Sequence, residues 1–430
     1  MSRILESAAT ARHADLEAWE TALRAAVLTA GANALAALLR NIGSGRQEPP
    51  VLCQCAGRME SQGLKEKQLL TILGPVPYSR SMFVCAACSK TRYPGDEMLD
   101  TGRSPGLRRM MARAGSQGTF NEGRDDLDVY AGIGVSAKDV ERVAERIGED
   151  TEKWLRRERE KICQEPPARL AKTIPILYIS YDGTGVPMTR AELKGRKGKQ
   201  PDGSARTREA KLGCVFTQTT TDDRGFPLRD PESTSFVGAI EPAEEFGWRI
   251  YAEAVRRGLH SAAQLVILAD GAEWIWNLAA THFPGATLIL DLYHARQHVS
   301  SLCKLLFGSD EKQAIRHRMF WWAHLDKGAV EKIVLDAGTK LPADHELRET
   351  AEKEIAYLEK NKERMRYAQF RAAGLFVGSG VVEAGCGSVI GQRLKRSGME
   401  WSLRGANAII SLRCVMTSGR FEEYWEDRTA

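Results

Sequence analysis

The stretch from Thr173 to Met188 constrains the fold more than any other part of this 430-residue chain. Its first half, from Ile174 to Ser180, is an apolar run rich in β-branched and aromatic residues, as expected for a strand buried on both faces. Asp182 follows, and the glycines from Gly183 to Gly185 predict a turn. A carboxylate at the end of a buried strand is held rigidly while it stays open to a ligand. The stretch therefore predicts a metal-binding acid at the end of a strand, and an Asp that merely begins a turn is the alternative.

Two later apolar runs also end in acidic residues. The run from Gln264 to Ala269 leads into Asp270, and the run from Ala286 to Leu290 leads into Asp291, with His294 three residues on. Adjacent strand ends bring their carboxylates into one crevice of an α/β sheet. We therefore expect the three strand-end acids to lie close together.

A fourth acid, Glu383, begins a glycine-rich segment near the C-terminus. Glu383, Gly387 and Gly391 are spaced four residues apart, which predicts that they share one face of a helix. Glycine inside a helix costs about 1 kcal/mol relative to alanine, so such a smooth face is expected only where another group approaches closely. Positive charge follows just beyond, at Arg393, Lys395 and Arg396.

Composition sets only broad limits. The length corresponds to roughly three domains. Hydrophobic and charged residues make up 43% and 27% of the chain, which is ordinary for a soluble globular protein. The net charge is a mild +5, but basic residues gather after the first predicted strand. They either contact a phosphate backbone or form a solvated, mobile hairpin loop, and they are Lys194, Arg196, Lys197, Lys199, Arg206 and Arg208.

Nine cysteines without a secretory signal indicate a reducing cytosol, where paired cysteines more often bind metal than form disulfides. Cys53 and Cys55 precede a predicted β-hairpin, and Cys85 and Cys88 follow it. This arrangement suits one structural Zn²⁺ with four thiolate ligands, and four unrelated free thiols are the alternative. The other five cysteines are interpreted as small core residues.

The N-terminal region reads as helix as far as about residue 45. Charged residues punctuate its first 24 positions, so no signal peptide is expected. The apolar segment from Ala25 to Leu39 is too short to span a bilayer, and we interpret it as a core or dimer helix.

A helical pair is predicted between residues 120 and 147. A helix from about Phe120 to Tyr130 is followed by a glycine turn and by a second helix capped by Ser136. This is the order of a DNA-binding helix-turn-helix, although any helical hairpin looks similar. The expected DNA contacts are Lys138 and Arg142 near the start of the second helix, and Arg108 and Arg109 in the basic stretch before the pair.

The order of these elements is ribonuclease H-like: a strand, two more strands (Leu212 to Thr219 and Ser235 to Ile240), a helix, two acid-ending strands, a helical insertion and a helix with an acid. The segments DGTGVPM, KLGCVF, DGAEWIWN, DLYHARQH and GSGVVEAGCGSVIGQRLKRSGMEWSLRGANAII together resemble the bacterial insertion-sequence transposases of the ISKra family. The resemblance implies a DDE triad of Asp182, Asp270 and Glu383.

The resemblance also implies the partners and cofactors of such an enzyme. It implies two Mg²⁺ or Mn²⁺ ions, double-stranded DNA as element ends and target, a homodimer or higher oligomer on DNA, no membrane, and the bacterial cytoplasm at the nucleoid. Asp291 and His294 resemble the C/D-x-x-H motif of several DDE groups. There His294 is expected to orient Asp291 or a phosphate, and a buried structural histidine is the alternative. Trp274 and Trp276 are assigned to the core rather than to base stacking.

The expected domains are a helical segment (1–48), a four-cysteine zinc-ribbon-like module (49–100), a helix-turn-helix region (101–150), a linker helix (151–172), an α/β ribonuclease H-like catalytic domain with a mixed sheet flanked by helices (173–300 and 373–420), and a helical insertion (301–372). The predicted function is DNA transposition by metal-dependent cleavage and strand transfer. A ribonuclease H-like nuclease or resolvase without strand transfer, and a DNA-binding protein whose acids are only structural, remain alternatives.

Overall fold

The computed structural model describes residues 15–42, 44, 46–47, 51–99, 102–168, 173–198, 200, 203–308 and 310–429. The chain forms two compact units, Met1–Ala144 and Glu145–Ala430. The first 14 residues of the predicted N-terminal helix and the basic residue Lys199 lie outside the described residues.

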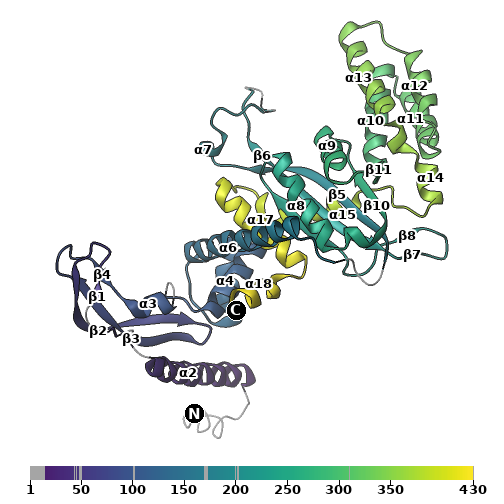
Figure 1. The fold of residues 1–430 in the computed structure, drawn as a ribbon. Helices are drawn as coiled ribbons and strands as arrows, with labels where there is room; N and C mark the ends of the chain where they lie inside the picture. The colour runs from purple at the N-terminus through teal and green to yellow at the C-terminus, as the bar shows by residue number, and fades with distance from the viewer. Residues whose placement is uncertain are drawn as a thin grey trace. The chain divides into compact units, whose positions relative to one another are not determined.

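The first unit combines a small antiparallel sheet with helices (Figure 1). The predicted hairpin is present, and its two long strands pair from Met59 opposite Cys85 to Thr71 opposite Gly74. The elements of this unit are α2 (Leu16–Ile42), β1 (Val51–Leu52), β2 (Arg58–Thr71), β3 (Gly74–Cys85), β4 (Thr91–Arg92), α3 (Pro94–Leu99), α4 (Pro105–Gln117), α5 (Phe120–Ala131) and the start of α6 (Ala137–Gln164).

Helix α2 packs on β3 through a narrow face. Ala32 and Ala36 are buried there with Val76, whereas Leu23 and Val27 are 45% and 68% exposed. The stretch Leu16–Asn41 has 26 residues and, by length and composition alone, could cross a membrane. The apolar segment predicted from the sequence is shorter because it begins after Arg24, whereas the helix continues through that residue. The length of α2 is therefore compatible both with an oligomerisation helix and with a membrane-spanning helix.

The second unit is built on a mixed five-stranded sheet in the order β11-β10-β5-β6-β9. Strand β10 runs parallel to β5 and β11, and β6 runs antiparallel to β5 and β9. The mixed α/β class predicted from the sequence is confirmed. The strands are β5 (Ile174–Pro187), β6 (Thr207–Gln218), β9 (Ser235–Ala239), β10 (Ala262–Ala269) and β11 (Thr287–Leu290), with a separate small hairpin of β7 (Thr220–Thr221) and β8 (Pro227–Leu228).

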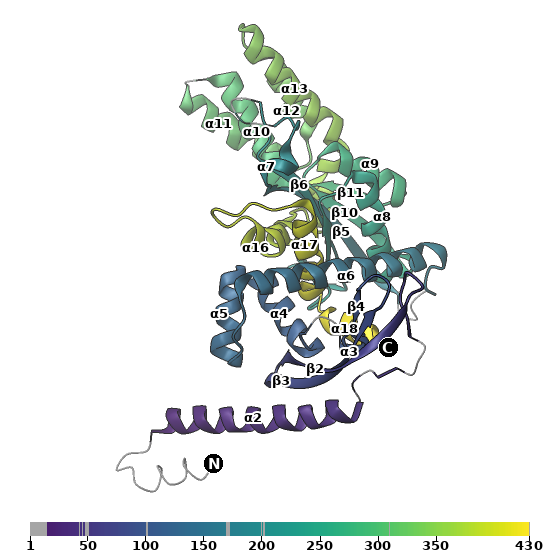
Figure 2. The same ribbon diagram turned by 90° about the vertical axis from the view of Figure 1, so that its left-hand side faces the viewer.

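Helices cover both faces of this sheet (Figure 2). On one face, Phe246 of α8 and Trp274 of α9 pack edge-on against Tyr181. On the other face, Gly385 lies against Phe236 of β9. Trp276 is 7% exposed in the same core, so the assignment of the tryptophans to the core is confirmed. The helices are α8 (Ala243–Arg256), α9 (Glu273–His282), α15 (Gly380–Gly385), the π-helix η3 (Cys386–Gly391), α16 (Gln392–Leu394), α17 (Leu403–Thr417) and α18 (Phe421–Thr429), with the short α7 (Arg190–Leu193) and η1 (Leu259–Ser261) in connections.

A helical insertion follows β11 and extends from one end of the sheet (Figure 1). It starts earlier than residue 301, because α10 follows directly on Asp291, which caps it. The insertion comprises α10 (Leu292–Phe307), α11 (Glu311–Asp326), α12 (Val330–Gly338), α13 (His345–Asn361), η2 (Lys362–Met365) and α14 (Tyr367–Ala372).

Helix α6 contradicts the expectation of a separate linker helix at 151–172. It is one continuous helix of 28 residues that crosses from the first unit into the second. Gly148, the only glycine within it, is required by packing, because a Cβ there would lie 2.2 Å from the carbonyl oxygen of Ala408. The second half of α6 is therefore part of the second unit.

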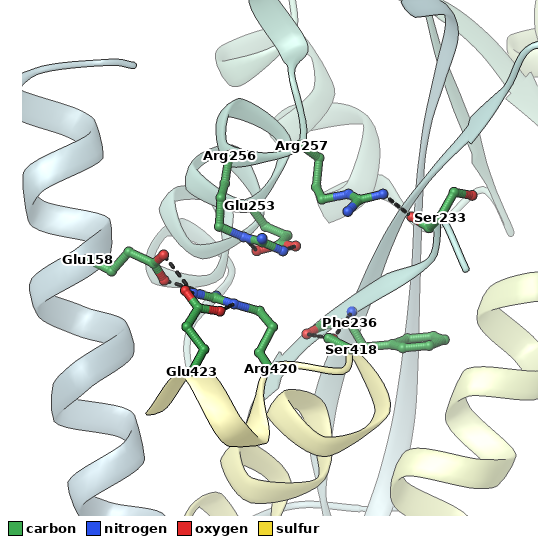
Figure 3. Close-up of polar contacts among 9 residues, drawn as sticks. All are labelled: Glu158, Ser233, Phe236, Glu253, Arg256, Arg257, Ser418, Arg420 and Glu423. Carbon is green, nitrogen blue, oxygen red and sulfur yellow. Dashed lines mark hydrogen bonds and ion pairs between the residues drawn. The ribbon is translucent and has the colours of Figure 1, made fainter. Parts of the chain in front are cut away.

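Ion pairs hold this half of α6 in place (Figure 3). Arg420 binds Glu158 of α6 at 2.7 and 3.0 Å and also pairs with Glu423 at 2.7 Å. The buried Arg249 of α8 binds Glu152 at 2.9 Å. A charged helix that looks like a solvated linker in the sequence is thus tied by ion pairs to Arg249 of α8 and to Arg420 just before α18.

Candidate functional site

Four carboxylates line one cleft of about 320 Å³ in the second unit. They are the three predicted strand-end acids and the acid of the glycine-rich segment, namely Asp182, Asp270, Asp291 and Glu383. The cleft is also lined by Tyr181, Tyr293, His294, Gln297, Ser379 and Val382. The structure therefore brings all five predicted catalytic residues to one place.

The sequence predicted Asp182 at the end of its strand, but Asp182 lies within that strand. The parallel partner β10 ends at Ala269, opposite Tyr181, whereas β6 pairs with β5 as far as Pro187. The expected glycine turn is therefore wrong. Gly183 is extended there, and a Cβ on it would lie 2.6 Å from Oε1 of Glu209 in β6. The carboxylate faces the cleft where the sheet loses one neighbour.

The pKa of the Asp182 carboxyl is raised, first by burial and also by the negative charges of Asp270 and Glu383. The thiol of Cys386 opposes this shift by donating a hydrogen bond to the carboxylate. The contributions of Asp270 and Glu383 to this shift are repulsions between the acids of the cleft.

Asp270 follows the last residue of β10, as predicted, and the insertion supports it. Its Oδ1 accepts a hydrogen bond from the N–H of Ala272 at 3.1 Å. The hydroxyl of Tyr357, on α13, donates to the Asp270 carbonyl at 3.3 Å. The Tyr357 ring is stacked on His298 of α10 with ring centroids 3.9 Å apart. No sequence signal pointed to Tyr357, which lies in a polar helical stretch without a motif, and His298 closes the segment DLYHARQH but was assigned no role there.

Asp291 is an anchor rather than an open ligand. It is 1% exposed. Its Oδ1 accepts from the N–H of His294 at 2.6 Å, and its Oδ2 accepts from the N–H of Ser379 at 2.6 Å. The interaction predicted between Asp291 and His294 is thus made by the histidine backbone, while the His294 ring lies 5.0 Å from that of His298.

Ser379 links two of the acids and was missed by sequence analysis. Its Oγ lies 3.0 Å from Oδ2 of Asp291 and 2.6 Å from Oε1 of Glu383. The hydroxyl has one proton, so it donates to one of the two carboxylates at a time. Its place four residues before Glu383 in the segment GSGVVE was the available signal.

The glycine face predicted after Glu383 is not formed. Helix α15 carries Glu383 and passes into the π-helix η3, so a four-residue spacing no longer keeps side chains on one face. A Cβ on Gly387 would meet nothing within 4 Å, whereas a Cβ on Gly385 would lie 2.4 Å from the Phe236 ring. The close approach occurs at Gly385, on the sheet side.

The cleft carries uncompensated negative charge. Within the described part of the chain, no Lys or Arg forms an ion pair with any of its four carboxylates. Lys395 is nearby and donates to the hydroxyl of Thr184 instead. Carboxylate oxygens without a Lys or Arg partner are the ligand atoms that hard divalent cations prefer. The residues of the cleft therefore fit Mg²⁺ or Mn²⁺.

The four predicted zinc ligands converge in the first unit. The Sγ atoms of Cys53, Cys55, Cys85 and Cys88 all lie within 4.8 Å of one another, and three of the separations are 3.4, 3.6 and 3.7 Å. Four Zn–S bonds of about 2.3 Å in a tetrahedron place sulfurs about 3.8 Å apart. The cluster is therefore compatible with zinc.

The loops around the thiols have the form that such a site needs. Backbone N–H groups of Cys88 and Ala87 donate to the Cys85 sulfur and lower its pKa to about 7. Gly57 lies against the sulfurs, and a Cβ there would be 2.8 Å from that of Cys85. Of the remaining cysteines, four are buried as expected, but Cys163 is exposed and is not a core residue.

Most of the predicted DNA contacts are exposed, with two exceptions. Arg108 is 5% exposed within α4, and Arg393 is fully buried with its guanidinium 4.9 Å from the Trp401 ring centroid. These two predictions are corrected, since buried guanidinium groups have no open surface for phosphates. The exposed residues are Arg109, Lys138, Arg142, Lys194, Arg196, Lys197, Arg206, Lys395 and Arg396, and Arg208 is half-buried beside Glu192.

The two helices of the predicted helix-turn-helix are present. Helix α5 ends at Gly132 in a left-handed conformation, and Ser136 accepts a hydrogen bond from the N–H of Asp139. The Asp139 carboxylate binds Arg103. A complete capping box is formed by Thr119 and Glu122 at the start of α5.

Comparisons with known proteins give distant similarities. No protein-family profile matches the chain. The chain is 22% identical over 382 residues to the UPF0236 protein in vanSb 3'region of Streptococcus gallolyticus, covering 86% of this chain and 76% of that protein. Among solved structures, it is similar to the Drosophila P element transposase strand transfer complex, with a TM-score of 0.23, 8% identity, and coverage of 75% of this chain and 80% of that one. It is also similar to NurA bound to dAMP and manganese, with a TM-score of 0.11, 12% identity, and coverage of 67% and 64%.

Proposed function

We propose that this protein is a DDE transposase of the ISKra type, which binds the ends of an insertion sequence, cleaves them and joins the freed 3′-OH to target DNA. The observation that carries the proposal is the convergence of Asp182, Asp270 and Glu383 in one uncompensated acidic cleft. Three antiparallel strands followed by two strands parallel to the first support a ribonuclease H-like fold.

The three acids are the metal ligands of the proposed site. Asp182, which lies beside both other acids, would hold two Mg²⁺ or Mn²⁺ ions together with Asp270 and Glu383. When bound, the ions would neutralise charge developing on the phosphate and make water a better nucleophile. Asp291, Ser379 and Tyr357 hold the acids in position.

The proposed chemistry consists of two displacements at phosphorus. In the first, a water oxygen bonds to the phosphorus at the element end and the bond to the 3′ oxygen breaks, which leaves a 3′-OH. In the second, that hydroxyl attacks a target phosphodiester, loses its proton and displaces another 3′ oxygen. Both steps use the same cleft, because each requires the same charge neutralisation.

The first unit is proposed to recognise DNA. Lys138 and Arg142 have side chains 69% and 71% exposed at the start of α6, and nearby acidic partners orient them. The exposed apolar surface of α2 supports a homodimer or higher oligomer on the DNA. One Zn²⁺ bound by the four thiols would fix the hairpin of this unit.

The test uses duplex oligonucleotides tiled from the DNA on both sides of the coding region, incubated with Mg²⁺ or Mn²⁺ and mapped to the nucleotide. Asp182→Ala, Asp270→Ala and Glu383→Ala should each abolish cleavage and joining while end binding is retained. Glu273→Ala, which removes an acid 77% exposed on α9, is the control and should leave both activities unchanged.

The products separate the rival functions. Cleavage without any joined product would favour a nuclease or resolvase. DNA binding without metal-dependent nicking would favour a DNA-binding protein with structural acids. A member of the triad whose alanine variant still joins DNA at the wild-type rate would be removed from the site.

A further inference from the structure

One aromatic side chain at the cleft has no role in the chemistry proposed above. Tyr293 lines the acidic cleft and is nevertheless 64% exposed. Other described aromatic residues are comparably exposed, among them Trp248 and Phe320, but neither of these lines the cleft. An exposed ring beside the reacting phosphate is placed to meet the nucleotide that carries it.

The ring is held in a defined position. Tyr293 lies in the first turn of α10, which begins where the N–H of Leu292 donates to the Val377 carbonyl at 2.9 Å and where Asp291 caps the helix. Gly378 lies against the ring, so that a Cβ there would approach Cε2 of Tyr293 to 3.2 Å. The helix start and the glycine together make the ring a fixed platform.

A polar group stands beside this platform. Gln297 is four residues after Tyr293 on α10, so the two side chains share one helix face. Gln297 is exposed and also lines the cleft. An amide offers both a donor and an acceptor, which suits the edge of a nucleobase.

The charge of the cleft favours a base over a phosphate at this position. Its described lining includes four acids but no Lys or Arg. A nucleobase beside Tyr293 carries no charge for those acids to repel and presents a face for stacking, whereas a phosphate at that position would need metal ions to offset the acids.

We propose that Tyr293 and Gln297 form a nucleobase subsite, in which a base next to the scissile phosphate leaves the DNA stack, lies on the Tyr293 ring and has its edge bound by the Gln297 amide. Extruding a base costs unstacking energy, which a rigid aromatic platform offsets. The subsite rests on the proposed function, because it takes the cleft as the place where DNA is cut.

The first experiment locates the contact. The full-length Asp182→Asn protein, which does not cut, is incubated with Ca²⁺ and with the tiled duplexes carrying 5-iododeoxyuridine at successive positions, then irradiated. The expected result is one main crosslink, mapped by mass spectrometry to Tyr293, from a single position beside the cleavage site. Crosslinks spread evenly over many positions, or none at Tyr293, would overturn the subsite.

The second experiment measures the energetic coupling between ring and base. An abasic nucleotide replaces the base found by crosslinking, and DNA binding is compared for wild type, Tyr293→Ala and Tyr293→Phe. Tyr293→Ala should weaken binding of intact DNA about fivefold to 100-fold and have no effect on abasic DNA, because stacking needs both partners. Tyr293→Phe should bind as wild type does. An equal loss on intact and abasic DNA would mean that Tyr293 has a structural role only.

Controls keep the subsite separate from the proposed function. Phe320→Ala removes a ring of 53% exposure on α11, outside the cleft, and should change neither binding nor crosslinking. A Tyr293 crosslink in the Asp182→Asn protein, together with a wild-type protein that cleaves none of the duplexes, would refute the transposase and keep the base contact. Normal cleavage without that crosslink would refute the subsite alone, and failure of the wild type to bind any duplex would refute both.

Discussion

Replacing Asp291 with alanine should destabilise the second unit and impair cleavage, even though Asp291 is not assigned as a metal ligand. Its carboxylate caps α10 through the N–H of His294 and also accepts from the N–H of Ser379, and both distances are 2.6 Å. Ser379 is itself only 4% exposed, so water does not replace the lost acceptor. The variant therefore loses a helix cap and leaves a buried N–H unsatisfied.

The two losses set the expected magnitude. A helix N-cap contributes about 1 kcal/mol, and an unsatisfied buried donor costs about 1–3 kcal/mol. The free energy of unfolding should therefore fall by about 2–4 kcal/mol, which for a unit of this size lowers Tm by roughly 3–7 °C. Below that Tm, the segment carrying Glu383 loses its anchor, and a displacement of about 1 Å at a reacting centre lowers rates roughly 100-fold.

The assay combines denaturant unfolding with the cleavage rate, and Asp310→Ala is the matched control. Asp310 caps α11 through the N–H of Gln313 at 3.0 Å, but it is exposed and anchors no second segment. Its loss should cost about 1 kcal/mol and leave cleavage intact. If Asp291→Ala proves no more destabilising than Asp310→Ala, the anchor role assigned to Asp291 is wrong.

Three further predictions concern other positions. Gly57→Ala places a Cβ 2.8 Å from the Cys85 sulfur and should lower the zinc content below one ion per chain. Gly134→Ala is the control, because open space surrounds Gly134, and it should leave the zinc content unchanged. Equal zinc contents in the two variants would refute the packing argument. Gly385→Ala should destabilise by about 1–3 kcal/mol through its clash with the half-buried Phe236 ring, while Gly387→Ala should be neutral or stabilising by up to about 1 kcal/mol in denaturant unfolding; the reverse order would contradict the placement of the π-helix. The raised pKa of Asp182 means that its ionisation opposes folding above the unfolded-state pKa, and that this penalty fades as pH falls through the folded-state pKa. Asp182→Asn should therefore stabilise the protein without divalent ions at pH 7 more than at pH 4, and a gain that does not change with pH would refute it.

The sequence by itself predicted the elements that local pattern encodes. The apolar runs of β5, β10 and β11 and the acids that follow them were visible because a buried strand needs a continuous apolar segment. The paired cysteines around a hairpin were visible because thiolate ligands come at short spacings. The start of α6 at Ser136 was visible because a capping side chain must precede the first turn.

Tertiary structure decided what depends on partners distant in the chain. Asp182 lies within a strand because β6 continues beside it after β10 ends, and no local signal shows where a neighbour stops. Arg108 and Arg393 look like other basic residues in the sequence, and only packing buries them.

The candidate site follows the same division. Local pattern supplied its acids, but Tyr357 and Ser379 support them through contacts 87 and 88 residues away in the chain. A hydrogen bond depends on where two groups meet in space, whereas periodicity records only which face of an element is buried. For that reason the acids could be read from the sequence, whereas the contacts that hold them in place could not.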